Sequence, residues 1–347
     1  MINKKWFGIK IIIFALILVI SACSSSNTNS SSSSNSESEG EETKELVKWK
    51  HGIVSAKADS GFILMAKEKD YFKKHGVEVE FMEFEGDATM IQALIAGELD
   101  SMEANPAASI NAINKGAKLK FIGSTMPGMP YALYTNSEIK SFKDLEGKIV
   151  GISKPGALPE IIVKAMLMEE GLDPASVTFV NAGGDVQRYQ ALMGGKVDAI
   201  ASASEFVPQA EKDGINVLGY AADIVPMYPR FVIVSSEKAL TEKPDAAAGF
   251  LAGEMEGLTY ALNNRDEAIK LAAKTIDVPE DNVRINSIYD EVKEKGYLSP
   301  KSEIPVDRIE WLQDFLFELG SIEKKVDLNT VIDESFRKKA LEMAEIE

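Results

Sequence analysis

Charged and hydroxyl side chains recur where short apolar runs of this sequence end. Basic ones such as Lys57 and Arg230 could hold a sulfonate or carboxylate through charge-assisted hydrogen bonds. Acidic ones such as Glu85 and Glu103 could instead accept hydrogen bonds from an amine, and they outnumber the bases. This pattern predicts binding of a small organic solute rather than a simple inorganic anion. The candidate ligand-binding residues are Lys57, Asp59, Ser60, Glu85, Asp87, Glu103, Asn105, Ser153, Gly156, Ala157, Leu158, Gly184, Asp185, Ser202, Glu205, Tyr228 and Arg230.

Several of these candidates also have purely structural interpretations. Asp87 and Asp185 each follow a glycine and precede a predicted helix, so helix N-capping would explain both. Asn105 is similarly placed to cap a helix or form a turn. Tyr228 could pack at a hinge rather than stack on a ligand, and Arg230 could form an ion pair between lobes.

Other chemistries lack the residues that they need. The only histidines are His51 and His75, and the only cysteine is Cys23, so histidine-rich or cysteine-based metal sites and disulfides are excluded. A Ser-His-Asp arrangement would need one of these two histidines. We expect no metal and no cofactor. The formal net charge of −16, without a basic stripe, disfavours nucleic acid as a partner.

The amino end has the features of a targeting segment. Residues 1–22 combine three lysines with a short apolar run, which favours a signal peptide over a spanning helix. The junction before Cys23 resembles the lipobox of bacterial lipoproteins, in which the cysteine is lipidated after cleavage; an ordinary signal peptide is the alternative. Residues 23–45 are serine-rich and then acidic, which predicts a disordered tether. The protein is therefore expected to be extracytoplasmic and lipid-anchored to the cell membrane through Cys23.

The segment 147–160 predicts a strand, a tight loop and a helix start that could position the candidates. Ile149 to Ile152 is short and apolar, as is typical of a buried parallel strand. Gly156 follows a proline, and this Pro-Gly pair predicts a loop after the strand. Pro159 suits the first turn of a helix. A helix N-terminus at the carboxyl end of a sheet offers free N–H groups, so this loop is predicted to form half of the ligand site.

The sequence also contains an internal repeat. Phe81 to Asp100 aligns without a gap with Phe179 to Asp198, a spacing of 98 residues. Each copy alternates strands and helices, which predicts two similar lobes built on parallel, doubly wound α/β sheets. The ligand is then expected in the cleft between two related helix starts. Upstream, a spacing of 95 residues matches Gly52, Gly61 and Gly76 with Gly147, Gly156 and Gly171.

The repeat suggests where the lobes begin and end. Lobe 1 is predicted to comprise residues 46–131, completed by 231–347, and lobe 2 to comprise 132–230. The chain would cross between lobes near Tyr131 and again near Tyr228. Within lobe 1, residues 62–75 are predicted to form one helix, and the helical tail after Pro244 is expected to pack on the first lobe.

The order and spacing of these motifs resemble extracytoplasmic substrate-binding proteins of ABC importers, in the nitrate/sulfonate/taurine (NitT/TauT-type) branch. The motifs are the lipobox, the serine tether, Lys69 to Val77, Gln92 to Asp100, Phe142 to Lys148 and Val197 to Ala199. The resemblance covers residues 46–345. It implies a type 2 periplasmic binding protein fold, two lobes joined by two crossovers, and closure around one ligand.

The resemblance also implies a function and partners. The chain would be a monomer that captures a small sulfonate or taurine-like solute and delivers it to a permease with its ATPase. The same branch includes binding proteins for aminopyrimidine precursors of thiamine, which is the alternative, and Pro155 to Glu160 resembles their second-lobe loop. A related pyrimidine-synthesising enzyme depends on a histidine and a cysteine cluster, and this chain has no cysteine besides Cys23. A surface enzyme or a sensor on the same scaffold is less favoured.

Overall fold

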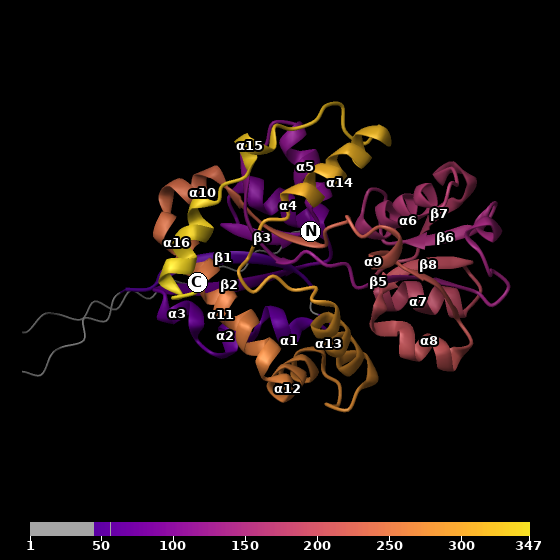
Figure 1. Ribbon diagram of the computed structural model, residues 1–347, viewed down its shortest axis with the longest axis horizontal. Helices are drawn as coiled ribbons and strands as arrows, with labels where there is room; N and C mark the ends of the chain where they lie inside the picture. The colour runs from indigo at the N-terminus through magenta and orange to yellow at the C-terminus, as the bar shows by residue number, and fades with distance from the viewer. Residues whose placement is uncertain (1–44, 56) are drawn as a thin grey trace, which may run out of the picture. The chain divides into compact units, whose positions relative to one another are not determined.

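A computed structural model of this protein describes residues 45–55 and 57–347. The described residues form one compact unit, which contains two five-stranded sheets, one in each of two lobes (Figure 1). The predicted signal peptide, all but the last residue of the predicted tether, and Cys23 lie outside the described residues. Within the described ranges, no helix is long and apolar enough to cross a membrane.

The sheet of lobe 1 has the strand order β2-β1-β3-β10-β4. β1 runs parallel to β2 and β3, whereas β10 runs antiparallel to both of its neighbours. β10 is the strand that returns from lobe 2, and it enters the sheet from the opposite end. The strands are β1 (Val47–Val54), β2 (Val77–Phe84), β3 (Ser101–Ala104), β4 (Leu119–Met126) and β10 (Phe231–Ser236).

The sheet of lobe 2 repeats this topology with the order β7-β6-β8-β5-β9. Its crossing strand, β5, is again antiparallel to both neighbours, while β6 is parallel to β7 and β8. The predicted two-lobe α/β architecture is therefore present, but the prediction of parallel sheets was wrong at the crossing strands. The strands are β5 (Tyr131–Thr135), β6 (Ile149–Ile152), β7 (Thr178–Asn181), β8 (Ala199–Ala203) and β9 (Asn216–Tyr220).

The strand register tests how the two copies align. Met82 pairs with Gly52 of β1, and Val180, 98 residues later, pairs with Gly151 of β6. The spacing of 98 residues is therefore correct downstream. Gly52 corresponds to Gly151, so the predicted match of Gly52 with Gly147 was wrong.

These glycines were mismatched because they are needed for different reasons. A Cβ on Gly52, in the middle of β1, would lie 2.7 Å from the Leu99 side chain, so the position requires close approach. Gly147 instead has a φ of +75° ahead of β6. Gly61 lies inside a helix while Gly156 has a φ of +74° in a loop, so this predicted pair does not correspond either.

Residues 62–75, predicted as one helix, fold into three short ones. Asp70 has a φ of 56° and separates the second from the third. Gly61 lies against α12 so closely that a Cβ there would be 2.1 Å from the Ala268 oxygen. The periodicity of apolar residues does not encode such a backbone contact, so it did not predict that the helix is interrupted. The helices are α1 (Ser60–Ile63), α2 (Met65–Glu68), α3 (Tyr71–Lys74) and α12 (Arg265–Ile276).

The remaining helices cover the sheets. In lobe 1 they are α4 (Asp87–Ala96) and α5 (Pro106–Asn114). Those of lobe 2, with three 3-10 turns, are η1 (Phe142–Leu145), α6 (Leu158–Glu169), η2 (Pro174–Ser176), α7 (Asp185–Met193), η3 (Ser204–Phe206), α8 (Val207–Asp213) and α9 (Ala221–Ile224). The carboxyl part adds α10 (Glu237–Glu242), α11 (Pro244–Asn263), α13 (Val283–Lys295), α14 (Val306–Glu318), α15 (Leu328–Val331) and α16 (Ser335–Met343).

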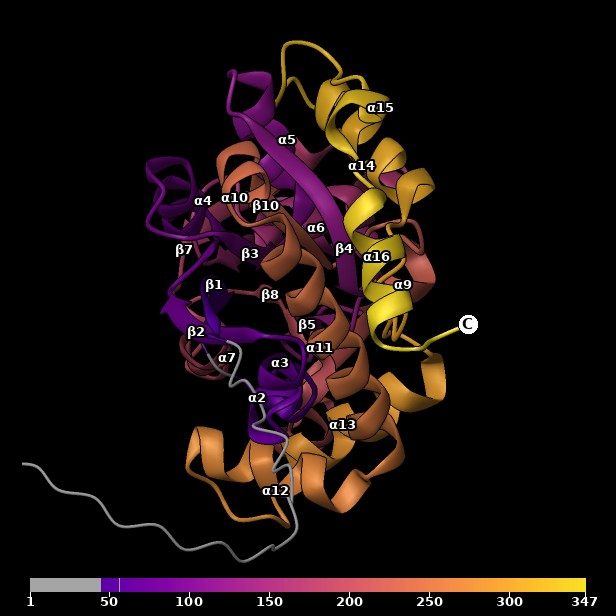
Figure 2. The ribbon, with the colours of Figure 1, turned by 90° about the vertical axis from the view of Figure 1, so that its left-hand side faces the viewer.

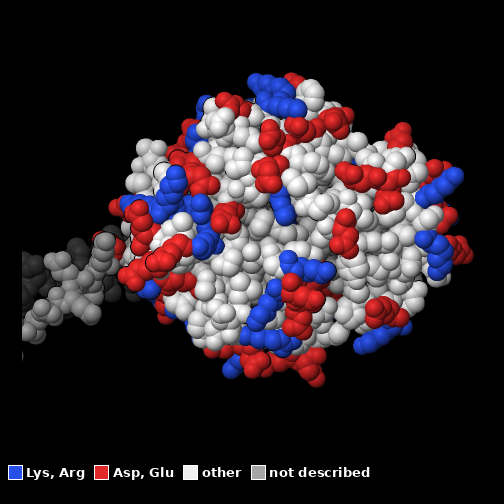
Figure 3. All heavy atoms as spheres, in the orientation of Figure 1, with Lys and Arg blue, Asp and Glu red and all other residues white. Residues whose placement is uncertain are grey.

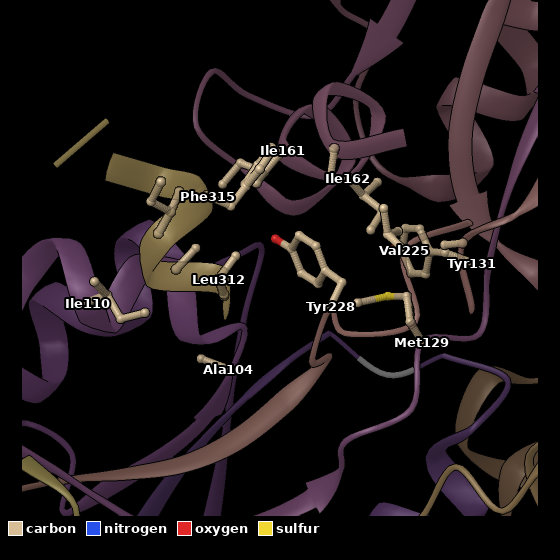
Figure 4. Packing of buried hydrophobic residues seen from close by; sticks show 14 of the residues in the cluster. Ala104, Ile110, Met129, Tyr131, Ile161, Ile162, Val225, Tyr228, Leu312 and Phe315 are labelled. Atoms are coloured by element: carbon tan, nitrogen blue, oxygen red, sulfur yellow. The ribbon is translucent and has the colours of Figure 1, made fainter. Parts of the chain in front are cut away.

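The C-terminal helices contact both lobes. α11 and α16 pack on lobe 1, with the Phe250 ring 6.0 Å from that of Trp49 (Figure 2). α13 instead contacts η3 and α8 of lobe 2. Leu312 and Phe315 of α14 share an apolar cluster with Ile161 of lobe 2 (Figure 4). The tail was expected to pack on the first lobe, and this was only partly right.

Charge is mixed over the surface that Figure 3 shows. Acidic and basic side chains are interspersed on this face, and they form no continuous basic stripe there. This face of the described chain therefore offers no extended track for a nucleic-acid backbone.

Candidate functional site

A small cavity lies at the carboxyl ends of β1 and β3, beside the crossing into β10. Its volume is about 20 Å³, which is room for about one water molecule. Five of the predicted site residues come together in its wall. The lining residues are Ile53, Val54, Ser55, Lys57, Asp59, Ser60, Ile63, Leu64, Glu103, Arg230 and Phe231.

Arg230 and Asp59 form a buried ion pair in this wall. The Arg230 Nη1 atom lies 2.7 Å from the Asp59 Oδ2 atom. Burial on its own would lower the pKa of Arg230, but Asp59, Tyr131 and Glu103 together raise it. The guanidinium also lies over the Phe231 ring at 4.4 Å from its centre, which holds its plane in place. Arg230 is therefore a fixed positive charge at the cavity.

Two buried donors in the wall have no hydrogen-bond partner among the described residues. They are the Nε of Arg230 and the hydroxyl of Ser60, and both residues line the cavity. Buried polar groups in native proteins are nearly always satisfied by protein, water or ligand. The cavity can therefore give one charged and one neutral hydrogen bond to the oxygen atoms of a solute.

Lys57 connects the cavity to lobe 2. Its Nζ lies 2.6 Å from the Oδ2 of Asp185, which also pairs with Arg188 and accepts a hydrogen bond of 3.1 Å from Ser202. Burial would raise the pKa of Asp185, but Lys57 and Arg188 together lower it well below its usual range. Burial likewise works against the charge of Lys57, yet Asp185 raises its pKa. Both members of the pair stay charged, and they tie the lobes together.

A second ion pair joins the lobes through α13. Arg284 donates to the carboxylate of Glu205 through Nη2 and through Nε at 3.0 Å, and its guanidinium lies 4.3 Å from the Phe206 ring centre. Burial raises the pKa of Glu205, and Arg284 opposes that rise. Glu205 was predicted as a ligand residue and Arg284 was not predicted at all. The sequence carried no signal for it, because it lies on a tail helix expected to pack away from lobe 2.

Glu103 brings an acid to the same cavity. It is 3% exposed, at the end of β3, and accepts a hydrogen bond from the Thr125 hydroxyl of β4. Burial raises the pKa of Glu103 to about 7, although Thr125 and Arg230 oppose the rise. Glu103 can therefore present either a carboxylate or a carboxylic acid to a solute in the cavity. Thr125 is a further residue that sequence reasoning missed.

Asn105 and Tyr228 have the structural roles that were left open for them. Asn105 caps α5 by accepting a 3.1 Å hydrogen bond from the N–H of Ala107, and it donates to the Pro229 carbonyl at 3.3 Å. The Tyr228 hydroxyl donates to the Asn105 Oδ1 at 3.4 Å, and its ring centre is 6.1 Å from that of Trp311. These residues hold the crossing in place, and Tyr228 points into the apolar cluster of Figure 4.

The capping interpretation was wrong for both Asp87 and Asp185. Each is the first residue of its helix, and the caps are Gly86 and Gly184, which have no side-chain bond to offer. Asp185 instead makes the pairs described above. Asp87 is half-buried with an unpartnered Oδ1, and burial raises its pKa to about 6 against the opposing effects of the Asn105 backbone and Lys57.

The loop of 153–158 is not part of the cavity wall. Gly156 is exposed, and its N–H donates a 2.6 Å hydrogen bond to the carboxylate of Glu160, in the first turn of α6. This N–H group of the loop is therefore already bonded within the protein. Glu85, also predicted, is exposed, and its Oε2 atom lies 3.9 Å from the Nζ atom of Lys154 in lobe 2. The cavity therefore does not include the second helix start, and the predicted pair of helix starts facing one ligand stays a prediction. The residues outside the lining are Glu85, Asp87, Asn105, Ser153, Gly156, Ala157, Leu158, Gly184, Asp185, Ser202, Glu205 and Tyr228.

Neither histidine of the sequence lies in the cavity. His51 is buried in β1, where its Nδ1 lies 2.7 Å from the Ser101 hydroxyl, and burial lowers its pKa to about 3. His75 follows α3, and its Nε2 lies 3.1 Å from a carboxylate oxygen of Glu256. A surface enzyme that uses histidine as general base therefore has no such base at this site.

Comparisons with known proteins show that this chain is similar to proteins that are named as binding proteins. The model of the family described as NMT1/THI5 like matches residues 57–268. The "Putative aliphatic sulfonates-binding protein" of Bacillus subtilis (strain 168) is 28% identical, over 81% of this chain and 85% of its own. The formylaminopyrimidine-binding protein of Halalkalibacterium halodurans is 24% identical, over 60% of this chain and 64% of its own. The solved periplasmic aliphatic sulphonate binding protein SsuA from Escherichia coli superposes with a TM-score of 0.68 at 21% identity, covering 83% of this chain and 92% of its own.

Proposed function

The chain belongs to the NMT1/THI5-like family, and from that premise we propose that it is the substrate-binding component of an ABC importer. It captures a small organic sulfonate between its lobes and delivers it to the permease and its ATPase. The predicted type 2 periplasmic binding protein fold is confirmed by the likeness to SsuA. The resemblance inferred from the sequence motifs is confirmed as well.

The observation that carries this proposal is the pair of unpartnered buried donors at the cavity. A sulfonate has three oxygen atoms that accept hydrogen bonds, and the Arg230 Nε and Ser60 hydroxyl are free to donate to them. Lys57 lies in the same wall and adds a second positive charge. A sulfonate is larger than the present cavity, so binding requires the lobes to open first and then close over it.

The remaining expectations on location become part of the proposal. The protein acts outside the cytoplasm as a monomer, held at the cell membrane by a lipid on Cys23 through the tether of 23–45. The lobes are proposed to comprise 46–131 with 231–347, and 132–230. Mass spectrometry of the membrane-extracted protein would show the lipid on an N-terminal Cys23, and its absence there would contradict the anchor.

A ligand panel tests the central claim. Ethanesulfonate, taurine, nitrate and an aminopyrimidine are each titrated by calorimetry and thermal shift, in buffers that are not themselves sulfonates. A ligand at 100 times its Kd stabilises the fold by about 2.7 kcal/mol, which raises Tm by several degrees. We expect the sulfonates to do so. Failure of every member of the panel would contradict the proposal.

Two variants locate the binding site. Ser60→Ala removes one neutral donor, worth about 0.5–1.5 kcal/mol, so affinity should fall about two- to tenfold without a change in charge. Arg230→Gln removes a charged donor and should cost more, about ten- to a hundredfold. Arg265→Gln is the matched control, since this arginine pairs with Asp290 on α13, away from the cavity. If Ser60→Ala and Arg230→Gln both bind like the unaltered protein and the control, the site lies elsewhere.

Capture of an aminopyrimidine precursor of thiamine is the second candidate. Asp59 and Glu103 place two carboxyl groups in the cavity wall, and these would accept hydrogen bonds from an exocyclic amine. The similarity to the formylaminopyrimidine-binding protein supports it over a shorter part of the chain than the sulfonate relative covers. In the same panel, a shift with the aminopyrimidine alone would favour this candidate.

A further inference from the structure

A groove lies between α13 and the η3, α8, β9 and α9 segments of lobe 2, and it shares no lining residue with the cavity at Arg230. α13 contacts η3 and α8, so this α13 groove lies beside a contact between α13 and lobe 2 (Figure 1). Its volume is about 450 Å³, within the range of roughly 300–1,000 Å³ that is typical of small-molecule sites. The α13 groove is therefore large enough for an organic molecule.

The wall of the α13 groove is acidic. In the part of the chain that the structure describes, no Lys, Arg or His nitrogen lies within 4.0 Å of the carboxyl groups of Asp223, Glu291 and Glu294 in this wall, whereas Asp290 has an arginine partner at 2.9 Å. Lys295 is the one base among the described lining residues. The groove therefore has an excess of negative charge, which favours a cationic occupant.

Ser204 adds a buried hydroxyl to the same wall. The residue is 1% exposed, and its Oγ lies outside hydrogen-bond geometry with every described residue. It is nevertheless near the carboxyl group of Glu291: burial raises the pKa of Glu291, and the Ser204 hydroxyl, with two nearby basic groups, opposes that rise. Buried polar groups are nearly always satisfied by protein, water or ligand. An ammonium group placed here can donate to the oxygen atoms of both side chains.

Two tyrosines give the α13 groove aromatic walls. Tyr220, the last residue of β9, is 37% exposed, and Tyr297 follows the end of α13. Tyr297 packs closely on Gly128, because a Cβ there would lie 2.3 Å from the tyrosine ring, and the Gly128 N–H donates to the Tyr297 carbonyl at 3.1 Å. Aromatic faces attract ammonium groups and also cover carbon chains. The walls thus suit a cation with an apolar body.

The arrangement of the acids favours an organic cation over a metal ion. Among the residues that the structure describes, no three His, Cys, Asp or Glu side chains lie close enough together to hold a metal ion. Glu291 is half-buried, whereas Asp223 and Glu294 are exposed. The acids are therefore spread from the buried part of the groove to its exposed part, and a chain with an ammonium group at each end matches such a spread.

We propose that the α13 groove is a second binding site, which takes a small aliphatic diamine. One ammonium group donates hydrogen bonds to Glu291 and Ser204, and the other lies at the two exposed acids. The carbon chain lies against the two tyrosines. This site is separate from the sulfonate site and does not depend on the proposed function.

Calorimetry with cadaverine tests the proposal. The titrations use phosphate buffer of low ionic strength without other amines, because salt screens exposed charges. We expect saturable binding of one cadaverine per protein, weaker binding of pentylamine, which lacks the second ammonium group, and no binding of pentanoate. Absence of cadaverine binding would overturn the proposal. Displacement of cadaverine by an equal concentration of Mg²⁺ would overturn it too, since the acids would then form a metal site.

Two variants and a control locate the diamine. Glu291→Gln removes a charged partner and should weaken cadaverine binding about ten- to a hundredfold. Tyr220→Leu removes an exposed aromatic face and should weaken it about two- to fivefold. Glu267→Gln is the matched control, since this acid pairs with Lys69 of lobe 1, and it should bind like the unaltered protein. Unchanged binding by both Glu291→Gln and Tyr220→Leu would place cadaverine elsewhere and refute the site.

The same preparations separate this site from the proposed function. Tyr220→Leu should keep the ethanesulfonate affinity of the unaltered protein, because Tyr220 does not line the sulfonate cavity. Binding of cadaverine without binding of ethanesulfonate would contradict the proposed function and support the diamine site. Binding of ethanesulfonate alone would overturn the diamine site and support the function.

Discussion

The ion pair between Arg284 and Glu205 allows a test of lobe closure that leaves the cavity wall intact. Arg284 lies on α13 and Glu205 on lobe 2, and neither lines the cavity. The pair is expected to exist only when the lobes are closed. Arg284→Gln should therefore weaken the binding of any solute that is held by the closed form, without touching the solute.

The size of this effect follows from the burial of the pair. Two unit charges 4 Å apart attract by about 4 kcal/mol at an effective dielectric constant of 20. The side chain of Arg284 is 26% exposed, so solvent screens part of this attraction, and the desolvation of Glu205 at 3% exposure offsets more. About 1–2 kcal/mol of closure free energy remains, which corresponds to an affinity about five- to thirtyfold lower.

The pH dependence of the variant gives a second readout. In Arg284→Gln, closure buries a carboxylate without its cation, and protonation of Glu205 relieves that cost. Burial already raises the pKa of this group, so the loss of affinity should shrink as the pH falls. Glu205→Gln should bind with little of this pH dependence, because it buries no charge.

Calorimetry with ethanesulfonate and small-angle X-ray scattering measure the two sides of this prediction. The scattering should show a larger radius of gyration for Arg284→Gln than for the unaltered protein, and the Arg265→Gln control should show no change. The double variant Glu205→Gln with Arg284→Gln should bind better than the sum of the single losses predicts. An affinity of Arg284→Gln within twofold of the original, or additive losses, would refute the reasoning.

Three further predictions concern stability. Gly61→Ala should cost more than 2 kcal/mol of unfolding free energy in urea, because its Cβ would lie 2.1 Å from the Ala268 oxygen, whereas Gly86→Ala, with open space around it, should cost less than about 1 kcal/mol. The lowered pKa of Asp185 means that its pairs stabilise the fold above the unfolded pKa of about 4, and that this stability is lost at lower pH. In urea titrations between pH 3 and 7, the unfolding free energy of Asp185→Asn should therefore fall less steeply at acid pH than that of the unaltered protein. An equally steep fall would contradict the pairing. Asn105→Ala should lower stability by about 1–2 kcal/mol, since it removes a helix cap, and a change below 0.3 kcal/mol would contradict that role.

Much of the fold could be predicted because its signals are local. β6 runs from Ile149 to Ile152 as expected, since β-branched and apolar residues mark a strand without reference to its neighbours. The spacing of 98 residues was predictable for the same reason, as both copies need the same turns and helix positions. The path of 62–75 was not, because the periodicity of apolar residues encodes neither the φ of 56° at Asp70 nor the approach of Gly61 to Ala268, about 200 residues later in the chain.

The site divides in a similar way. Position at a strand end was enough to select Lys57, Ser60 and Glu103, since the carboxyl ends of parallel strands gather at one edge. It also selected Ser153, which the cavity wall does not include, because strand order does not reveal that Glu160 satisfies that loop from within. Arg284 could not be found, since nothing local distinguishes an interlobe arginine from a surface one.

The crossing strands impose an order on folding. Every strand of the lobe 2 sheet lies between residues 131 and 220, so that sheet can form from one continuous stretch of chain. The lobe 1 sheet cannot, because β10 separates β3 from β4 and is the last of its strands to emerge. β4 pairs with no other strand in the described sheet, so it must wait for the second crossing. A chain cut before residue 231 would thus keep a complete lobe 2 sheet and leave the edges of β3 and β4 exposed to aggregation.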